Sequence, residues 1–393
     1  MASMFGHDVS RALREAAPHD LIPTARSLLI ELTGAQDAIV LLADYGRTVL
    51  QPVTVLPHAA ESLSAVDGPC GTAFSTQQPV VERVGETVET HVPMTVRGDR
   101  FGVLSVKLPG TDAGQDMVDE IAEFAVALGH ELLIADRETD LFQQARRRRR
   151  LTLAAEMQWQ LLPGCGCSRQ EFTLGGHLEP AYAVGGDNFD WASSADHLIV
   201  TVTDGMGQGV DASLLTSLTV NAMRNARRAG LDVVGQACLA DQAVYAQYGG
   251  TSHASTLLLR FDLANGRVSA VDAGSPHIYR HRQGRVERVG LTPQMPLGMF
   301  EDTPYVEQTF DVEPGDRLIV VSSGVHGAQA EDGTEFGRAS LRDGIHASRE
   351  AGPYDTARSV VGSLFDHVGT TDIEADAAVV CLDWTGRPTA PRS

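Results

Sequence analysis

The sequence predicts an α+β protein with an N-terminal α/β domain, a helical linker and a C-terminal domain in which helices cover antiparallel strands. In the second half, apolar stretches of strand length alternate with longer amphipathic stretches, and Asn265-Gly266 supplies a hairpin turn. In the first third, a helical pattern precedes an apolar strand and a hairpin. With 393 residues and 43% hydrophobic content, the chain can form two or three domains with packed cores.

The N-terminal region reads as helix, strand, hairpin and helix. Apolar residues at helical spacing predict a helix over residues 8–33 that contains Pro23, and Ala38–Ala43 predicts a buried strand. A turn region lies between Gly71–Phe74 and Pro79–Val81. A hairpin around Arg97-Gly98-Asp99 is expected to join His91–Val96 to Phe101–Val106, and a long helix starts near Asp116.

A helical connector is expected over residues 116–163. Its apolar positions alternate steps of four and three, which is a heptad seam and predicts a coiled-coil homodimer: Ile121, Ala125, Leu128, Leu132, Ala135, Thr139 and Phe142. The five arginines Arg146–Arg150 follow, and we interpret them as a solvated or helix-paired face. The expected domains are residues 1–135 and 164–386, with a disordered tail over 387–393.

Strands and helices alternate in the second half. The expected helices are residues 210–228, with Leu214, Leu218 and Ala222 on one face, and residues 232–247. The expected strands are Phe172–Ala183, His197–Thr203, Ala254–Phe261, Arg267–Asp272, Arg317–Ser322 and Ala377–Leu382.

Two acidic residues stand at strand ends in the stretch Val184–Gly209. Asp187 follows a Gly-Gly pair, and Asp204 closes an apolar strand just before Gly205, Gly207 and Gly209. Carboxylates at the mouth of a sheet are oxygen ligands of the kind that Mg²⁺ and Mn²⁺ prefer. The pattern predicts a divalent cation between Asp187 and Asp204.

Four motifs resemble the PPM-type metal-dependent protein serine/threonine phosphatases of the SpoIIE/RsbU branch. They are A-E-M-Q-W-Q-L-L-P at Ala155–Pro163, P-A-Y-A-V-G-G-D-N-F-D at Pro180–Asp190, D-G-M-G-Q-G at Asp204–Gly209 and P-G-D-R-L-I-V-V-S-S-G-V at Pro314–Val325. The resemblance implies an α/β/β/α sandwich with antiparallel sheets. It also implies metal-dependent hydrolysis of phosphoserine or phosphothreonine, with Asp187 and Asp204 as catalytic acids.

The same resemblance implies a ligand set, from which this chain departs. One Mn²⁺ or Mg²⁺ would be held by Asp187, Asp204 and the carbonyl of Gly205, and a second ion would share Asp204 and need two more acids. Ser323 and Ala375 stand at those two positions, so the second ion is expected to bind weakly or not at all. Asp190 and Asp376 are accessory candidates. Other acids that we consider as substitutes are Asp332, Asp372 and Glu374.

The N-terminal region resembles a GAF domain, through V-P-M followed by R-G-D-R-F-G-V-L-S-V. A GAF-like sensor implies a small ligand, which the sequence leaves unknown. His58, Cys70 and His91 are isolated residues to which we assign no cofactor.

Charge and cysteine usage exclude several classes. Lys+Arg 31 against Asp+Glu 51 gives a formal charge of −20, which argues against nucleic acid or a membrane as partner. The five cysteines are scattered, no run approaches the roughly 18 apolar residues of a membrane span, and no signal pattern opens the chain. We expect a cytoplasmic protein.

Three functions compete. The first is a signal-regulated protein phosphatase whose substrate is a phosphoprotein, by resemblance a STAS-type anti-sigma antagonist. The second is a pseudophosphatase that serves as a binding or signalling module. A diguanylate cyclase is disfavoured, because Asn188 replaces the acid in G-G-D-N-F and D-G-M-G-Q-G has no place in that fold.

Overall fold

The chain forms two compact units in a computed structural model, Met1–Arg150 and Leu151–Ser393. The structure describes residues 7–53, 62–110, 113–147, 152–181 and 184–387. Both units combine helices with antiparallel sheets, which confirms the predicted α+β class. None of the helices in these described ranges is long and apolar enough to cross a membrane.

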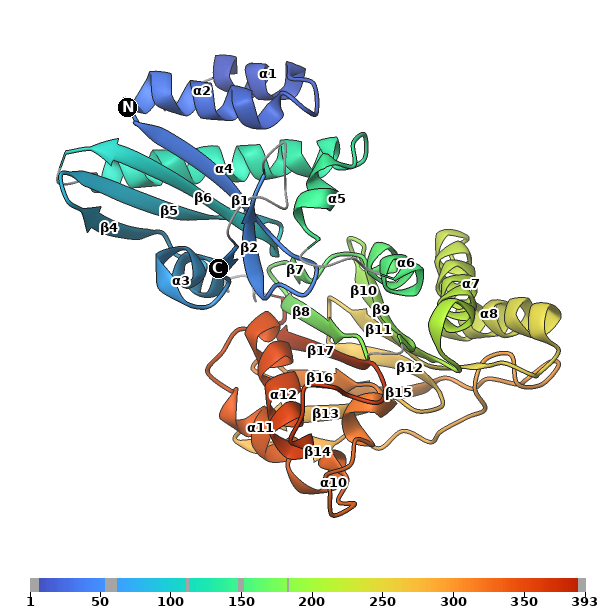
Figure 1. Cartoon of the computed structure of the whole chain (residues 1–393). Coiled ribbons are helices and arrows are strands. Elements are labelled where there is room, and N and C mark those ends of the chain that lie inside the picture. Colours follow the sequence, from blue (N-terminus) through green and yellow to red (C-terminus); the bar gives the residue numbers. More distant parts are fainter. Residues whose placement is uncertain (1–6, 54–61, 111–112, 148–151, 182–183, 388–393) are drawn as a thin grey trace, which may run out of the picture. The chain divides into compact units, whose positions relative to one another are not determined.

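The first unit is a six-stranded antiparallel sheet with helices on both faces (Figure 1). In the order β3-β2-β1-β6-β5-β4, its strands are Leu63–Ser64, Val49–Pro52, Asp37–Ala43, Asp99–Pro109, Thr87–Val96 and Val80–Val84. On one face α1 (His7–Glu15), α2 (Leu21–Thr33) and α4 (Gln115–Ala135) share a core with the sheet, and α5 (Leu141–Ala145) joins it. On the other face α3 (Gly68–Thr76) covers a smaller core.

The helix predicted over residues 8–33 is two helices, so that prediction is wrong in its continuity. The break between α1 and α2 contains Pro18, and a proline disfavours the helical conformation of the residue before it. Pro23 lies in the first turn of α2, where a missing N–H does no harm. The predicted hairpin around Arg97-Gly98-Asp99 is confirmed as the β5–β6 turn.

The coiled-coil interpretation of the heptad seam is wrong. Ile121, Ala125 and Leu128 of α4 are fully buried against the sheet of their own unit, and Phe142 of α5 lies in the same core. The connector is also broken into α4, α5 and α6 (Leu153–Leu161) in the described residues. Among the described residues, the predicted homodimer therefore has no exposed apolar seam through which to form. Most of the arginine run and the C-terminal tail lie outside the described residues.

The second unit stacks two antiparallel sheets face to face (Figure 1). One sheet has the order β15-β12-β11-β10-β9, with strands Gln308–Asp311, Arg267–Ala273, Ala254–Asp262, His197–Gly205 and Gly186–Ser193. The other has the order β14-β13-β16-β17-β8-β7, with strands Arg285–Arg288, His277–Arg282, Arg317–Val321, Ala377–Trp384, Phe172–Glu179 and Gly166–Ser168. Apolar side chains from both sheets, among them Phe172, Phe189 and Phe261, form the core between them.

Helices cover the outer faces of both sheets and complete the predicted α/β/β/α sandwich. Helices α7 (Gly209–Arg228) and α8 (Val233–Tyr248) pack on the first sheet, and α11 (Leu341–Ala347) and α12 (Pro353–Val368) pack on the second. The short helices α9 (Ser323–His326) and α10 (Phe336–Ala339) lie between β16 and α11 in the chain.

Two expectations for this unit are wrong in detail. Strand β9 is not among the expected strands, because its glycines and acids hide the alternation of a strand. Leu214 does not face the core: it is 48% exposed, whereas Leu215, Val220 and Met223 form the buried face of α7.

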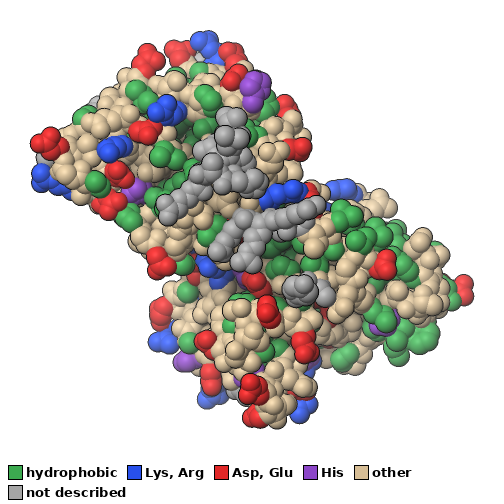
Figure 2. All heavy atoms as spheres, in the orientation of Figure 1, with side chains coloured by type: hydrophobic (Ala, Val, Ile, Leu, Met, Phe, Trp, Pro, Cys, Tyr) green, Lys and Arg blue, Asp and Glu red, His purple; other side chains and the backbone are tan. Residues whose placement is uncertain are grey.

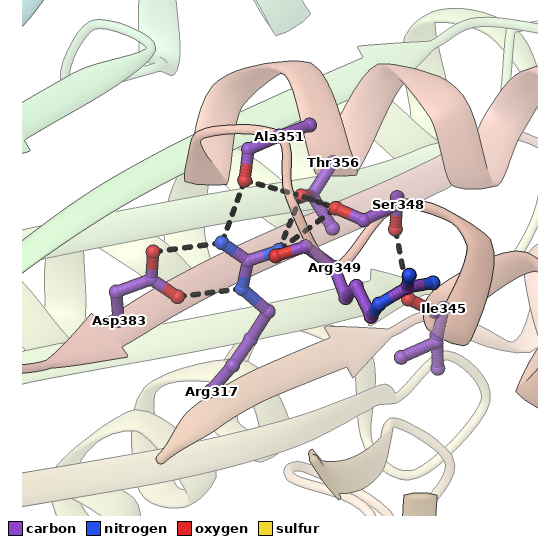
Figure 3. Close-up of polar contacts among 7 residues, drawn as sticks. All are labelled: Arg317, Ile345, Ser348, Arg349, Ala351, Thr356 and Asp383. Carbon is purple, nitrogen blue, oxygen red and sulfur yellow. Dashed lines mark hydrogen bonds and ion pairs between the residues drawn. The ribbon is translucent and has the colours of Figure 1, made fainter. Parts of the chain in front are cut away.

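A buried arginine ties the second sheet to the helices that cover it (Figure 3). Arg317 of β16 forms a bidentate pair with Asp383 of β17, with Nε–Oδ1 and Nη2–Oδ2 distances of 2.6 and 2.8 Å. The same guanidinium donates to the carbonyls of Ser348 and Ala351 and to Oγ1 of Thr356. With a further bond to the Arg349 carbonyl, four hydrogen bonds from Arg317 hold the α11–α12 connection against the sheet, and the two to Asp383 join β16 to β17.

Candidate active site

The candidate site begins with Asp187 and Asp204, which the structure places directly opposite each other on β9 and β10. The next pair in register is Gly186 and Gly205, and a Cβ on Gly186 would lie 2.3 Å from the Gly205 carbonyl oxygen. Only glycine fits there, because the two backbones approach so closely. Oγ1 of Thr216 on α7 also donates a 2.7 Å hydrogen bond to the Gly186 carbonyl, which fixes the strand end to the helix.

Asp187 is buried in a negatively charged environment. Burial raises its pKa well above the usual range for a carboxyl, and the charges of Asp204 and Asp376 raise it further, against hydrogen bonds from Ser322 and the Ala378 backbone. Its Oδ2 atom is buried and makes no hydrogen bond to any described residue. Among the described residues, an ionised carboxylate in this position has no positive partner.

Two positions depart from the phosphatase pattern, Ser323 and Ala375. Both lie at the end of the sheet that carries Asp204. Oγ of Ser323, the first residue of α9, donates a short hydrogen bond to Oδ2 of Asp204. Ala375 lies beside the next residue of that helix, because a Cβ on Gly324 would be 3.2 Å from the Ala375 Cβ. The structure therefore brings Asp204, Ser323 and Ala375 together, although neither of the last two offers a carboxylate.

Asp376 is fully occupied by hydrogen bonds. Its Oδ1 accepts from the backbone N–H groups of Ala181 and Gly185 at 2.8 and 2.9 Å. Its Oδ2 accepts from Nε2 of Gln158, which also donates to the Asp187 carbonyl at 3.0 Å. Burial raises the pKa of Asp376 and these donors oppose the rise. Asp376 holds the segment before β9 in place and is not available as a replacement ligand.

Gln158 is a site residue that the sequence reasoning missed. It is buried on α6, inside the motif Ala155–Pro163, and it joins Asp187 to Asp376. The motif could have pointed to it, since Gln158 is a polar residue within an otherwise apolar helical stripe.

The other acids proposed from the sequence do not join the site. Asp190 is buried and pairs with Arg224 and Arg227 of α7 at 2.7 and 3.0 Å, so it anchors the helix to β9. Asp332 accepts from the backbone of Thr334 in an exposed turn. Asp372 and Glu374 are exposed. The accessory role suggested for Asp190 is therefore not supported.

Two stacked histidines form a second unpredicted feature near the mouth. The rings of His277 on β13 and His326 on α9 lie 3.6 Å apart between centroids, with planes 8° from parallel. Nε2 of His326 lies 3.0 Å from the Ser275 carbonyl, and Nδ1 of His277 has no hydrogen-bond partner in the described part of the chain. Burial, followed by the charges of His326 and Arg288, lowers the pKa of His277 to about 3. Both rings are neutral at neutral pH, since burial also lowers the pKa of His326.

This pair predicts a loss of stability in acid. Because the pKa of His277 is lower in the folded state than its ordinary value of 6.5, the stabilisation is complete above about pH 6.5 and is lost as the pH falls toward 3. Urea unfolding of the second unit should show a smaller decrease in unfolding free energy from pH 7.5 to pH 5 for His277→Gln than for wild type. Equal decreases would contradict the burial argument.

The residues present fit one divalent cation. Asp187 offers an unsatisfied buried oxygen, Asp204 offers the opposite carboxylate, and the Gly205 carbonyl lies at the same strand ends. A doubly charged ion would offset the repulsion that raises the pKa of Asp187. A second ion would find only the shared Asp204 carboxylate and the Ser323 hydroxyl.

The chain is similar to several known proteins. Residues 194–385 match the family described as "Stage II sporulation protein E (SpoIIE)", a segment that includes Asp204, Ser323 and Ala375 but not Asp187. Protein IcfG of Synechocystis is 23% identical over 227 residues, which are 50% of this chain and 35% of IcfG. The chain thus spans about a third of the length of this relative.

Solved structures give further similarities at low identity. The RsbU and RsbW domains of Rv1364c from Mycobacterium tuberculosis are 22% identical, with 58% of this chain and 63% of that chain covered and a TM-score of 0.49. The PP2C domain of SpoIIE from Bacillus subtilis, with a fragment of its regulatory domain, is 12% identical, with 80% and 83% covered and a TM-score of 0.48. Residues 194–385 of the second unit thus match the SpoIIE family, in agreement with the PPM-type resemblance of the sequence motifs.

Proposed function

We propose that this protein is a metal-dependent protein serine/threonine phosphatase that works with one firmly bound Mn²⁺ or Mg²⁺. The observation that carries the proposal is the buried Oδ2 of Asp187, which has no hydrogen-bond partner and lies beside the opposite acid Asp204. An uncompensated carboxylate pair at a sheet edge can bind a cation. Without a cation, the buried negative charge destabilises the folded protein.

Each residue around the cation site has a proposed role. Asp187, Asp204 and the Gly205 carbonyl would hold the cation, which when bound neutralises charge on phosphoryl oxygens and lowers the pKa of water. Gln158 and Asp376 position Asp187 through the backbone around it. Ser323 donates to Asp204 and takes one of the oxygens that a second ion would need.

The second candidate function is a pseudophosphatase that binds phosphoproteins without turning them over. The hydrogen bond from Ser323 to Asp204 favours it. The serine hydroxyl occupies a carboxylate oxygen of Asp204 at the position where the phosphatase pattern has another acid. Calorimetric titration with Mn²⁺ counts the sites, and a phosphoserine-peptide hydrolysis assay separates the two candidates: one site with measurable hydrolysis supports a slow enzyme, and one site without hydrolysis supports the binding module. Two tight sites would contradict the single-cation proposal.

The proposed substrate is a phosphoserine on a regulatory protein, by resemblance a STAS-type anti-sigma antagonist. Exposed apolar side chains support a protein partner: Met206, Val210 and Leu214 follow Asp204 at the start of α7 and are 51%, 40% and 48% exposed. Figure 2 shows hydrophobic side chains over α7 and α8. Such a patch beside a small polar mouth suits a folded or peptide substrate. We further propose that the first unit is a GAF-like sensor that regulates the second.

The proposal predicts that Asp204→Asn removes Mn²⁺ binding while the fold remains. Asp204 faces Asp187 directly, and neutralising one of two opposed acids relieves repulsion in the metal-free protein. Calorimetry should show at least about a 100-fold loss of affinity, which corresponds to roughly 2.7 kcal/mol. Asp366→Asn, on the exposed side of α12, is the matched control. Unchanged affinity in Asp204→Asn would show that the cation binds elsewhere.

A further inference from the structure

A mixed group of metal-ligating side chains lies in the first unit, on the β4–β5 hairpin. Ligand atoms of Glu82, Glu89 and His91 all lie within 4.8 Å of one another, and this is the one such group among the described residues. Glu89 and His91 are two residues apart on β5 and therefore point to the same face. Glu82 of β4 pairs directly with Glu89 in register.

The two glutamates are an unfavourable arrangement on their own. Like charges directly opposite each other on neighbouring strands destabilise a sheet. Lys107 lies opposite Glu89 on its other side, but the Nζ–Oε1 distance is 3.8 Å and the lysine side chain is 40% exposed, so its compensation is weak. A divalent cation between the carboxylates would turn this repulsion into attraction.

His91 has the surroundings of a metal-binding histidine. Its side chain is 3% exposed, with Nε2 3.4 Å from Oε1 of Glu82 and Nδ1 3.2 Å from Sγ of Cys70 on α3. Histidine ligands are commonly oriented by a partner on the other ring nitrogen, which fixes the tautomer. With Nδ1–H donating to Sγ, the lone pair of Nε2 faces the two carboxylates.

Cys70 can orient the His91 ring in this way. Its side chain is buried on α3, where Sγ lies within hydrogen-bond reach of Nδ1 of His91. Cys70 thus contributes to the group by orienting His91.

We propose that Glu82, Glu89 and His91 bind a divalent transition-metal ion of the zinc class, with Cys70 orienting His91 and a fourth position open to solvent. An imidazole with two carboxylates suits Zn²⁺ and its neighbours and is a poor site for Mg²⁺ or Ca²⁺. Ligand atoms at about 2.1 Å from a tetrahedral ion lie about 3.4 Å apart, so the group must contract. The glutamate side chains are 40% and 28% exposed, which leaves them room to move and gives the ion a path in.

The test uses the full-length chain after chelation, with Co²⁺ as a coloured substitute for Zn²⁺. The Asp204→Asn background removes the proposed centre of the second unit, so failure here and failure of the proposed function are distinguishable. We expect one equivalent of Co²⁺ to give visible d–d bands that Zn²⁺ abolishes by displacement. Glu89→Gln and His91→Gln should each lower the Co²⁺ affinity at least 10-fold, and Cys70→Ser should lower it less than either.

Glu86→Gln is the matched control, because it removes the same charge from an exposed position in the β4–β5 turn. Glu82→Gln guards against misfolding of the buried histidine variant. It should weaken Co²⁺ binding yet leave the metal-free protein melting no lower than wild type, since it removes a like-charge pair. Absence of the d–d bands, or equal weakening by Glu86→Gln and Glu89→Gln, would overturn the proposal.

Discussion

Ser323→Asp combined with Ala375→Asp is expected to raise Mn²⁺-dependent hydrolysis of an aryl phosphate by about 100-fold, equivalent to roughly 2.7 kcal/mol of activation free energy. The two positions lie together beside Asp204 at the start of α9. Two new carboxylates there would supply the oxygen ligands that a second cation lacks. Each single variant should change the rate little, because an ion with one new ligand stays under-coordinated, so the effects should not add.

The thermal stability of the double variant, measured with and without Mn²⁺, is a second test of the same prediction. Without metal, the added acids increase the repulsion around Asp187, so the double variant should melt below wild type. Excess Mn²⁺ should then stabilise it more than it stabilises wild type, because the ion binds only the folded state. Ser194→Asp with Ala195→Asp adds the same charge to the exposed β9–β10 turn and is the control. A folded double variant as slow as wild type would favour the pseudophosphatase.

Arg317→Ala is expected to destabilise the second unit by about 3–5 kcal/mol, the usual cost of breaking a buried ion pair. The side chain is 9% exposed, and its removal leaves the Asp383 carboxylate without its bidentate partner and Oγ1 of Thr356 without its donor. Arg317→Lys should fall between wild type and alanine, since an ammonium keeps the charge but cannot form the bidentate pair. All three tryptophans lie in the second unit, so tryptophan fluorescence in urea reports its unfolding selectively.

Arg280→Ala supplies the comparison. Arg280 lies on the neighbouring strand β13 and pairs with Glu287, whose side chain is 57% exposed, so its loss should cost no more than about 1 kcal/mol. If both alanine variants unfold at the same urea concentration, the network in Figure 3 does not stabilise the unit as argued.

The sequence by itself determined the strand ends that carry the site. Gly-Gly-Asp and Asp-Gly are local signals: they place an acid at a strand end and remove the side chains that would keep two backbones apart. The register that sets Asp187 opposite Asp204 could not be predicted in the same way, because β9 is not among the expected strands. The loss of carboxylates at Ser323 and Ala375 was also visible in the motifs, because it is a matter of residue type.

The sequence could not decide what an apolar stripe packs against. The seam from Ile121 to Phe142 has the spacing of a coiled coil, but a helix lying on a sheet needs the same stripe, and the sheet of the first unit covers it. The same ambiguity misplaced Leu214, since α7 is apolar on more than one side and only the packed sandwich selects the buried one.

Only the tertiary structure decided the polar contacts that complete the site. Ser323 reaches Asp204 across 119 residues, and Gln158 reaches Asp376 across 218. Hydrogen bonds of this kind depend on where sheets and helices meet, and no local propensity encodes that meeting. For the same reason Cys70, Glu82 and His91 look isolated along the chain and become neighbours only when α3 packs on the β4–β5 hairpin, because folding, not spacing, brings their ligand atoms together.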